Sequence, residues 1–165
     1  MSIPLSHCSS CGAAYPRTPT GDLPDWPRRC KQCGNASYRN PLPVAVALVP
    51  VAAGILTVRR SIPPKIGELA LPGGFMEIGE QWQDAVAREL FEETGISTDP
   101  AQITFFSALS SPGGHLLIFG RCQALSQLPT FSANHEVSEL VVVDQPIELA
   151  FPLHTQALHE ILALR

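Results

Sequence analysis

The sequence predicts an α/β fold in which a mixed sheet lies between helices, preceded by a small cysteine-rich unit. Short apolar runs of strand length surround one amphipathic helical segment, and a second helical pattern closes the chain. Four of the five cysteines fall within the first 40 residues. At 165 residues, with 45% apolar and 16% charged side chains, the chain suits one ordinary domain with an appendage.

Charge is distributed unevenly along the chain. Residues 1–40 carry five basic and two acidic side chains, whereas the remainder carries six basic and thirteen acidic ones. Because the larger part is acidic, it is not expected to bind nucleic acid by charge alone. The sequence begins without a secretory-signal pattern and has no apolar run of bilayer-spanning length, so the expected location is the cytoplasm, with no membrane partner.

The first element is a zinc ribbon, expected over residues 1–40. Two CxxC knuckles, Cys8–Cys11 and Cys30–Cys33, are separated by eighteen residues, a spacing typical of this module. Four thiolates fill a tetrahedral zinc site completely, which indicates a structural rather than a catalytic ion. Disulfide-bonded or free cysteines are the alternative, and a reducing compartment disfavours disulfides. Cys122 lies in an apolar run and is expected in the core.

The main domain is expected over residues 41–165, after the short linker at 38–43. Its predicted strands are short apolar runs bounded by turn residues. They are expected at residues 44–51, 54–60, 68–72, 103–109, 115–122 and 138–144. A closing helix is predicted over 154–165, where Leu158, Ile161 and Leu162 form one stripe.

The central helix is expected to begin at Glu80 and to end before Gly95, a residue suited to a left-handed helix terminus. At about 100° per residue, Glu89, Glu92 and Glu93 fall on one face. Like charges one turn apart repel, so a cation is expected among them, and Arg88 is expected to pair with Glu92. Clustered carboxylates suit Mg²⁺ or Mn²⁺. The consecutive glycines Gly73 and Gly74 would allow close backbone approach to a metal or phosphate.

The same stretch resembles the Nudix box. Gly74, five residues, Glu80, seven residues and then Arg88–Ile96, reading RELFEETGI, match its defining positions. The flanks RRSIPP and LPGGF are also similar to the family, although Leu69 stands where many relatives have tryptophan. The resemblance implies the α/β/α sandwich of Nudix hydrolases with a mixed sheet, here preceded by a small zinc ribbon. It also implies metal-dependent hydrolysis of a nucleoside diphosphate linked to another group.

The resemblance also implies roles for individual residues. Arg88 would orient the catalytic carboxylates. The Mg²⁺ or Mn²⁺ ligands would be Glu89, Glu92 and Glu93, with Glu80 and the carbonyl of Gly74 as further ones. The general base varies within the family; Glu136 is preferred here because it precedes a strand, and Glu139, His135 or a box glutamate remain alternatives. Candidate substrate contacts are Tyr38, Arg59 and Phe75, with Trp82 a further candidate for a nucleobase slot.

The substrate is expected to be FAD, ADP-ribose or a similar dinucleotide or nucleotide sugar. Ribbon-bearing relatives include NADH pyrophosphatases, but the SQPWPFPxS-type motif of that branch is replaced here by SALSSPGGHLLIFG, which argues against NADH preference. Two other functions stay open: an RNA-cap or NAD-cap hydrolase that binds RNA through the ribbon, and a non-catalytic nucleotide sensor, which the complete box disfavours. The ribbon could instead serve as a scaffold or as the contact of a homodimer.

Overall fold

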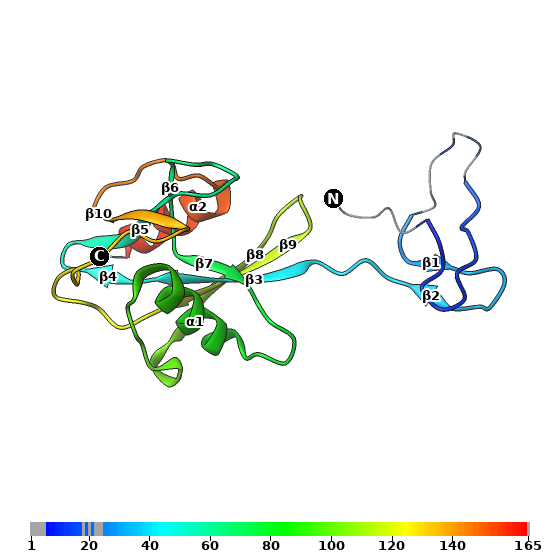
Figure 1. Ribbon diagram of the computed structural model, residues 1–165, viewed down its shortest axis with the longest axis horizontal. Coiled ribbons are helices and arrows are strands. Elements are labelled where there is room, and N and C mark those ends of the chain that lie inside the picture. The colour runs from blue at the N-terminus through cyan, green and yellow to red at the C-terminus, as the bar shows by residue number, and fades with distance from the viewer. Residues whose placement is uncertain (1–5, 18, 20, 22–24, 165) are drawn as a thin grey trace. The chain divides into compact units, whose positions relative to one another are not determined.

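The computed structural model describes residues 6–17, 19, 21 and 25–164, and its chain divides into two units, Met1–Pro41 and Leu42–Arg165. In the first unit, a two-stranded antiparallel ladder joins β1 (Arg28–Arg29) to β2 (Ala36–Ser37). Figure 1 labels these strands and the elements of the second unit. The second unit contains β3 (Leu42–Leu48), β4 (Pro50–Val51), β5 (Gly54–Arg60), β6 (Leu69–Ala70), β7 (Gly73–Phe75), α1 (Trp82–Thr94), the short 3₁₀ helix η1 (Pro100–Gln102), β8 (Thr104–Ser110), β9 (His115–Arg121), β10 (Val137–Val143) and α2 (Pro152–Ala163).

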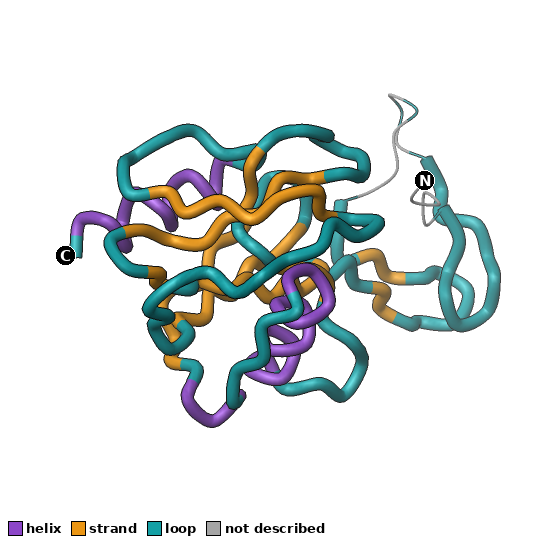
Figure 2. Tube along the Cα trace, turned by 60° about the vertical axis from the view of Figure 1, so that its left-hand side comes forward, coloured by secondary structure: helices purple, strands orange, loops and turns teal. Residues whose placement is uncertain are grey.

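The strands of the second unit form two four-stranded sheets. One sheet has the order β7-β3-β9-β8 and is mixed, because β3 runs parallel to β9 while the other pairs are antiparallel. The other is antiparallel and has the order β10-β5-β4, with β6 also paired to β5. Figure 2 shows the strands with one helix on either side. The predicted α/β fold with a mixed sheet and two helices is confirmed.

Alternation along β3 explains how one strand supports both helices. Successive side chains of a strand point to opposite faces. Ala45 and Ala47 belong to the core that contains the buried residues of α1, whereas Val46 and Leu48 belong to the core that contains those of α2. All four are fully buried. An unbroken apolar run is therefore what the sequence of a strand covered on both faces should show.

Several predicted boundaries need correction. The run 44–51, expected as one strand, is divided between the two sheets: β3 ends at Leu48 and β4 begins at Pro50. The break lies at Val49, whose carbonyl accepts the amide of Leu56 instead of continuing the pairing with β9. Strand β7 was not predicted. The closing helix ends at Ala163, and Arg165, which the prediction included, lies outside the described residues.

Neither α1, with 13 residues, nor α2, with 12, has the length and apolarity to cross a bilayer, and no other helix in the described residues does. Helix α1 ends where the sequence predicts. Gly95 adopts φ 73° and donates its amide to the carbonyl of Phe91 at 2.8 Å. A left-handed residue of this kind terminates a helix without the steric cost of a Cβ atom. The end of the box helix is therefore fixed by its own sequence.

His154, in the first turn of α2, connects that helix to the strand preceding the glycine pair. Its Nδ1 accepts the amide of Leu71 at 3.2 Å, and its ring lies edge-on to Phe151 and Phe119. Burial, reinforced by the charge of Arg60, lowers the pKa of His154 to about 4. A neutral imidazole is therefore part of the packing between α2 and this strand.

This lowered pKa predicts a loss of stability in acid. Between pH 6.5 and 4 the unfolded chain binds a proton that folded His154 does not, so stability present above pH 6.5 falls as the pH approaches 4. The contribution of His154 is about 3 kcal/mol over that interval. His154→Gln keeps an acceptor for the amide of Leu71. Its free energy of unfolding, measured with urea, should fall less between pH 7 and pH 4.5 than that of the parent. Parallel pH profiles for parent and variant would contradict the prediction.

Candidate active site

Helix α1 carries its box glutamates at different depths relative to its core contacts. Ala85, Val86 and Leu90 are fully buried beneath the helix. Glu92 is exposed on the other side, with 57% of its side chain accessible, and Glu89 lies between them with 13% accessible. The predicted grouping of glutamates along the helix is therefore present, and Glu92 is more exposed to solvent than Glu89.

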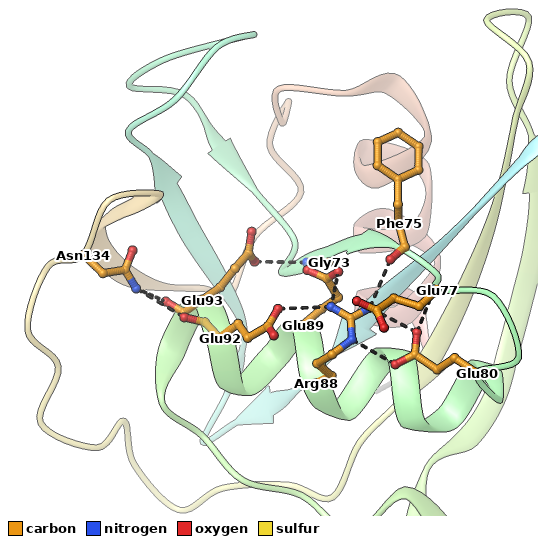
Figure 3. Close-up of polar contacts among 9 residues, drawn as sticks. All are labelled: Gly73, Phe75, Glu77, Glu80, Arg88, Glu89, Glu92, Glu93 and Asn134. Carbon is orange, nitrogen blue, oxygen red and sulfur yellow. Dashed lines mark hydrogen bonds and ion pairs between the residues drawn. The ribbon is translucent and has the colours of Figure 1, made fainter.

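Arg88 is the centre of this group, as Figure 3 shows. Its Nε donates to Glu80 at 2.9 Å and its Nη1 donates to Glu89 at 2.7 Å and to Glu92 at 3.0 Å. Its Nη2 donates to the second oxygen of Glu80 at 3.1 Å and to the carbonyl of Phe75 at 3.0 Å. A guanidinium has five N–H donors, so these five bonds use all of them. The predicted pair with Glu92 is present as one part of a larger network.

Glu80 joins this network from outside the helix. It was expected to begin α1, but the helix starts at Trp82 after an extended N-cap at Gln81. The amide of Glu80 bonds the carbonyl of Glu77 at 3.2 Å, which closes a turn with Gly79 at φ 86°. The turn directs Glu80 towards Arg88, whose hydrogen bonds lower the pKa of that carboxyl. Glu80 thus neighbours Glu89 by way of Arg88, not by helical periodicity.

The glycine pair lies in β7, directly beside the helix. The amide of Gly73 donates to Oε2 of Glu93 at 3.0 Å. A Cβ atom on Gly74 would lie 2.5–2.6 Å from the carboxylate of Glu89, so the missing side chain makes room for that group. The backbone of these glycines, expected to lie close to a metal or phosphate, lies close to the carboxylates of Glu89 and Glu93. Gly74 pairs with Ala45 of β3, which fixes its position.

Glu93 is the least solvated of the box glutamates, with only 7% of the residue exposed. Burial raises its pKa to about 8, and the charges of Glu89 and Glu136 add to the effect, against the opposing Gly73 amide and Arg60 charge. Burial likewise raises the pKa of Glu89, although Arg88 opposes it. Burial is thus the main reason that the ionised form is unfavourable at both positions, and neighbouring carboxylates add to it.

The donor set fits a divalent cation. Carboxylate oxygens are hard ligands of the kind that Mg²⁺ and Mn²⁺ prefer, and a dication would favour the ionised form of these buried carboxylates. In the described part of the chain, the four cysteines are the one group of three or more ligand residues already placed to hold a metal ion, with their sulfur atoms within 4.8 Å of one another. The oxygens of Glu80, Glu89 and Glu92 instead lie around the guanidinium of Arg88, while Glu93 accepts the amide of Gly73. The carboxylates therefore have the chemistry that a divalent ion prefers, and three of them are held by Arg88.

Glu136 lies on the loop before β10 and is exposed. Its charge contributes to the raised pKa values of Glu89 and Glu93, which places it in the electrostatic environment of the box helix. The backbone of the same loop is held by Asn134, a residue that sequence analysis did not select. Glu139, the alternative base, is bound instead by Arg59 at 2.7 Å.

The candidate substrate contacts differ in their surroundings. Phe75 is 55% exposed and its ring lies 5.8 Å from the ring of His115, a residue that sequence analysis also missed. Arg59 bonds Glu139 and the carbonyl of Gly67. Trp82 packs on the core around α1, edge-on to Phe105, so its role there is packing. Tyr38, exposed, belongs to the unit Met1–Pro41.

The four front cysteines converge within that unit. Cys8 Sγ lies 3.7 Å from Cys33 Sγ, and Cys11 Sγ lies 3.7 Å from Cys30 Sγ. All four are free thiols, as is Cys122, which is buried in the core around α1. Amides of Cys11 and Ser10 lower the pKa of Cys8 to about 6, which favours the thiolate that binds metal. The cluster is compatible with the small zinc ribbon expected from the sequence.

Comparison with known proteins links this geometry to a family. A family model described as NUDIX domain matches residues 41–161. The ADP-ribose pyrophosphatase of Methanocaldococcus jannaschii is 34% identical over 82 residues, which are 48% of each chain. The NAD-capped RNA hydrolase NudC of Haemophilus influenzae is 34% identical over 92 residues, which are 54% of this chain and 33% of that protein. The match thus spans about half of the length of the archaeal relative and about a third of the length of the NudC relative.

One solved structure resembles nearly the whole chain. It is the NUDIX hydrolase from Nitrosomonas europaea, with a TM-score of 0.75 and 26% sequence identity. The likeness covers 98% of this chain and 92% of that one. The similarity therefore extends beyond the segment that the family model matches.

Proposed function

Because the chain belongs to the Nudix family of hydrolases, we propose that it cleaves the diphosphate linkage of a nucleoside-diphosphate derivative, with ADP-ribose as the first candidate substrate. The proposal depends above all on one observation: Glu80, Glu89 and Glu92 surround Arg88, and Glu93 accepts an amide of the neighbouring glycine pair in β7. The named activity of the archaeal relative supports the choice of ADP-ribose. FAD and related dinucleotides contain the same diphosphate linkage between AMP and a second phosphorylated group and belong to the same proposal.

Residues 1–40 are proposed to form a zinc-binding unit and residues 41–165 the catalytic one. In the latter, Glu89, Glu92 and Glu93 would hold Mg²⁺ or Mn²⁺, with Glu80 and the carbonyl of Gly74 as further ligands. When bound, such an ion neutralises the diphosphate and lowers the pKa of a coordinated water. The chain's own groups then orient the reactants.

Three residues are proposed to act during hydrolysis. Arg88 holds the carboxylates of Glu80, Glu89 and Glu92 in position through four of its five hydrogen bonds. A carboxylate oxygen of Glu136 accepts the proton of the attacking water, whose oxygen bonds to phosphorus while the bridging P–O bond breaks. The exposed ring of Phe75 offers an apolar face to the nucleobase. Arg59 is already bound by Glu139, so a substrate contact from it would replace that ion pair.

A substrate panel tests the proposal directly. ADP-ribose, FAD, NADH, diadenosine polyphosphates and nucleoside triphosphates should be assayed with Mg²⁺ and with Mn²⁺, and both products identified. ADP-ribose or FAD should give AMP as one product, in a reaction that EDTA abolishes. Equal turnover with EDTA, or cleavage of triphosphates alone, would contradict the proposal.

A second candidate is hydrolysis of NADH or of an NAD cap on RNA. The NudC relative supports it, as do the basic residues of the first unit, in which the Arg28 guanidinium lies 4.1 Å from the centre of the Trp26 ring. Reversal of the charges at Arg29 and Lys31 should then abolish salt-dependent RNA binding. Absence of RNA affinity at low salt would exclude this use of the ribbon.

Loss of one cysteine should unfold the first unit while sparing the chemistry. Structural zinc supplies about 10–16 kcal/mol of apparent binding energy in zinc-finger peptides, and Cys8→Ser removes one of four ligands. Zinc content should fall from one ion per chain to none, with hydrogen exchange accelerated only before residue 41. Cys122→Ala, a cysteine outside the cluster, should keep its zinc. Normal stability combined with lost turnover would contradict a structural role.

A further inference from the structure

The side chain of Asn134 joins two parts of the active site that are distant in sequence. Its Nδ2 donates to the carbonyl of Glu93 at 3.0 Å and to that of Glu92 at 3.4 Å. Its Oδ1 accepts the amides of Glu136 at 2.9 Å and Val137 at 2.8 Å. One amide group therefore connects the end of α1, as Figure 3 shows, to the loop that carries Glu136.

The acceptors on α1 are available because of where they lie. The last carbonyls of a helix have no partner within the helix. Gly95 satisfies the carbonyl of Phe91, and Asn134 satisfies the two that follow. These carbonyls belong to Glu92 and Glu93, whose side chains are the proposed metal ligands. The bridge therefore begins on the backbone of the catalytic residues themselves.

The loop is also attached on its other side. The amide of Ser61, directly after β5, donates to the carbonyl of Glu136 at 2.7 Å. The amide of Asn134 donates to the carbonyl of Val137 at 2.9 Å, which closes the turn around Glu136. The hydrogen bond between Ser61 and Glu136 is made by backbone atoms alone, whereas the hydrogen bonds to α1 come from the side chain of Asn134. Substitution at position 134 can therefore detach the loop from α1 while its connection to β5 stays.

We propose that Asn134 is a positioning residue that holds the carboxylate of Glu136 at the reacting phosphorus by tying its loop to the box helix. The inference rests on the proposed function, in which Glu136 accepts the proton of the attacking water. Asn134 itself contacts no reacting atom. Its loss should lower kcat by on the order of 10- to 100-fold, because a misplacement of about 1 Å is enough for such an effect. KM should stay within about twofold, since substrate binding needs no proton transfer.

Two substitutions separate the two ends of the bridge. Asn134→Asp keeps the acceptor for Glu136 and Val137 but replaces the donor that reaches α1 with an oxygen. Asn134→Ala removes both ends and adds no charge. Both variants should lose kcat, with ADP-ribose and Mn²⁺ as the probe, and should melt near the parent temperature. Impairment of the Asp variant alone would assign the effect to its added charge and overturn the proposal.

A double-mutant cycle with Glu136→Gln tests whether Asn134 acts through Glu136. In the Glu136→Gln background, Asn134→Ala should have little further effect on kcat, because the group that it positions is already inactive. An equal loss in both backgrounds would show a merely structural role and overturn the proposal, while the proposed function stands. Ser132→Ala, an exposed change in the same loop, should leave kcat at the parent value.

Failure of the underlying function gives a different result. If Glu136→Gln alone turns over ADP-ribose at the parent rate, then Glu136 is not the base, and the positioning proposal is overturned together with that assignment. If the parent protein does not hydrolyse ADP-ribose, the choice of substrate is wrong, and so is the effect predicted for Asn134 with this probe. Failure of the positioning role, of Glu136 as the base and of ADP-ribose as the substrate therefore give three different results.

Discussion

Replacement of Glu93 by glutamine is expected to lower kcat by on the order of 10³-fold while leaving the fold intact. Interaction with a metal ion supplies several kcal/mol of transition-state stabilisation, and each 1.36 kcal/mol is worth tenfold in rate. Glutamine has the same shape as glutamate and can still accept the Gly73 amide, now bonded at 3.0 Å. The variant therefore removes a charge and little else.

Stability of the metal-free protein should not fall in this variant. Burial and the neighbouring charges of Glu89 and Glu136 raise the pKa of Glu93 to about 8, so an ionised carboxylate is unfavourable there. Neutral glutamine avoids that cost. Thermal unfolding without metal should show a melting temperature equal to the parent's or higher, and calorimetric titration should show weakened Mn²⁺ binding.

The control is Glu68→Gln, which removes the same charge from an exposed pair with Lys65 at 3.1 Å. That pair lies outside the box, and surface ion pairs of this kind contribute about 0–1 kcal/mol. Its kinetics should match the parent. Turnover by Glu93→Gln at the parental rate, with undiminished Mn²⁺ binding, would show that the buried carboxylate is not a ligand.

The sequence predicted the helix of the box and the grouping of its glutamates because both depend on local rules. Helical periodicity places Glu89 and Glu93 on one side, and Gly95 ends the helix. The strand at residues 54–60 was predicted with its observed bounds, since its apolar run is closed by a turn before it and by arginines at its end. These features can be predicted without knowledge of the tertiary contacts.

Features that depend on tertiary contacts were missed. Asn134 reads as an ordinary loop residue, and its importance comes from carbonyls more than 40 residues earlier in the chain. The division of the first strand at Val49 depends on which strands compete for its backbone groups. The sequence analysis predicted Glu80 at the start of the helix because its spacing from Glu89 fits the helical period. That spacing applies only if residue 80 is already helical. Gly79, which adopts a left-handed turn, was the feature of the sequence that indicated a later start of the helix.

The glycine pair allows catalysis and folding to be tested separately. Gly74→Ala would place a Cβ atom 2.5–2.6 Å from the carboxylate of Glu89, which is the end of a flexible side chain and can move aside. The fold should survive, but Glu89 should leave its position beside Arg88, now 2.7 Å away. Because Glu89 is proposed to act in hydrolysis, its displacement is expected to lower kcat by on the order of 10²-fold.

Gly73→Ala meets a different obstacle. Its Cβ atom would lie 2.4 Å from the carbonyl oxygen of Ala45 and 2.8 Å from the Cα of Val46, both in the backbone of β3. These residues are fully buried between the two cores, so the strand cannot move aside as a side chain can. Overpacking of this kind is expected to cost about 3 kcal/mol or more of folding stability.

Urea unfolding and steady-state kinetics at saturating Mn²⁺ should therefore give opposite results for the two alanines. Gly74→Ala should retain most of its stability and lose turnover, whereas Gly73→Ala should lose stability first. The contrast arises because the same added methyl group meets a mobile carboxylate at one position and a fixed backbone at the next. Equal destabilisation of both variants, or parental kcat in Gly74→Ala, would show that the space at Gly74 is not needed to hold Glu89 in its catalytic position.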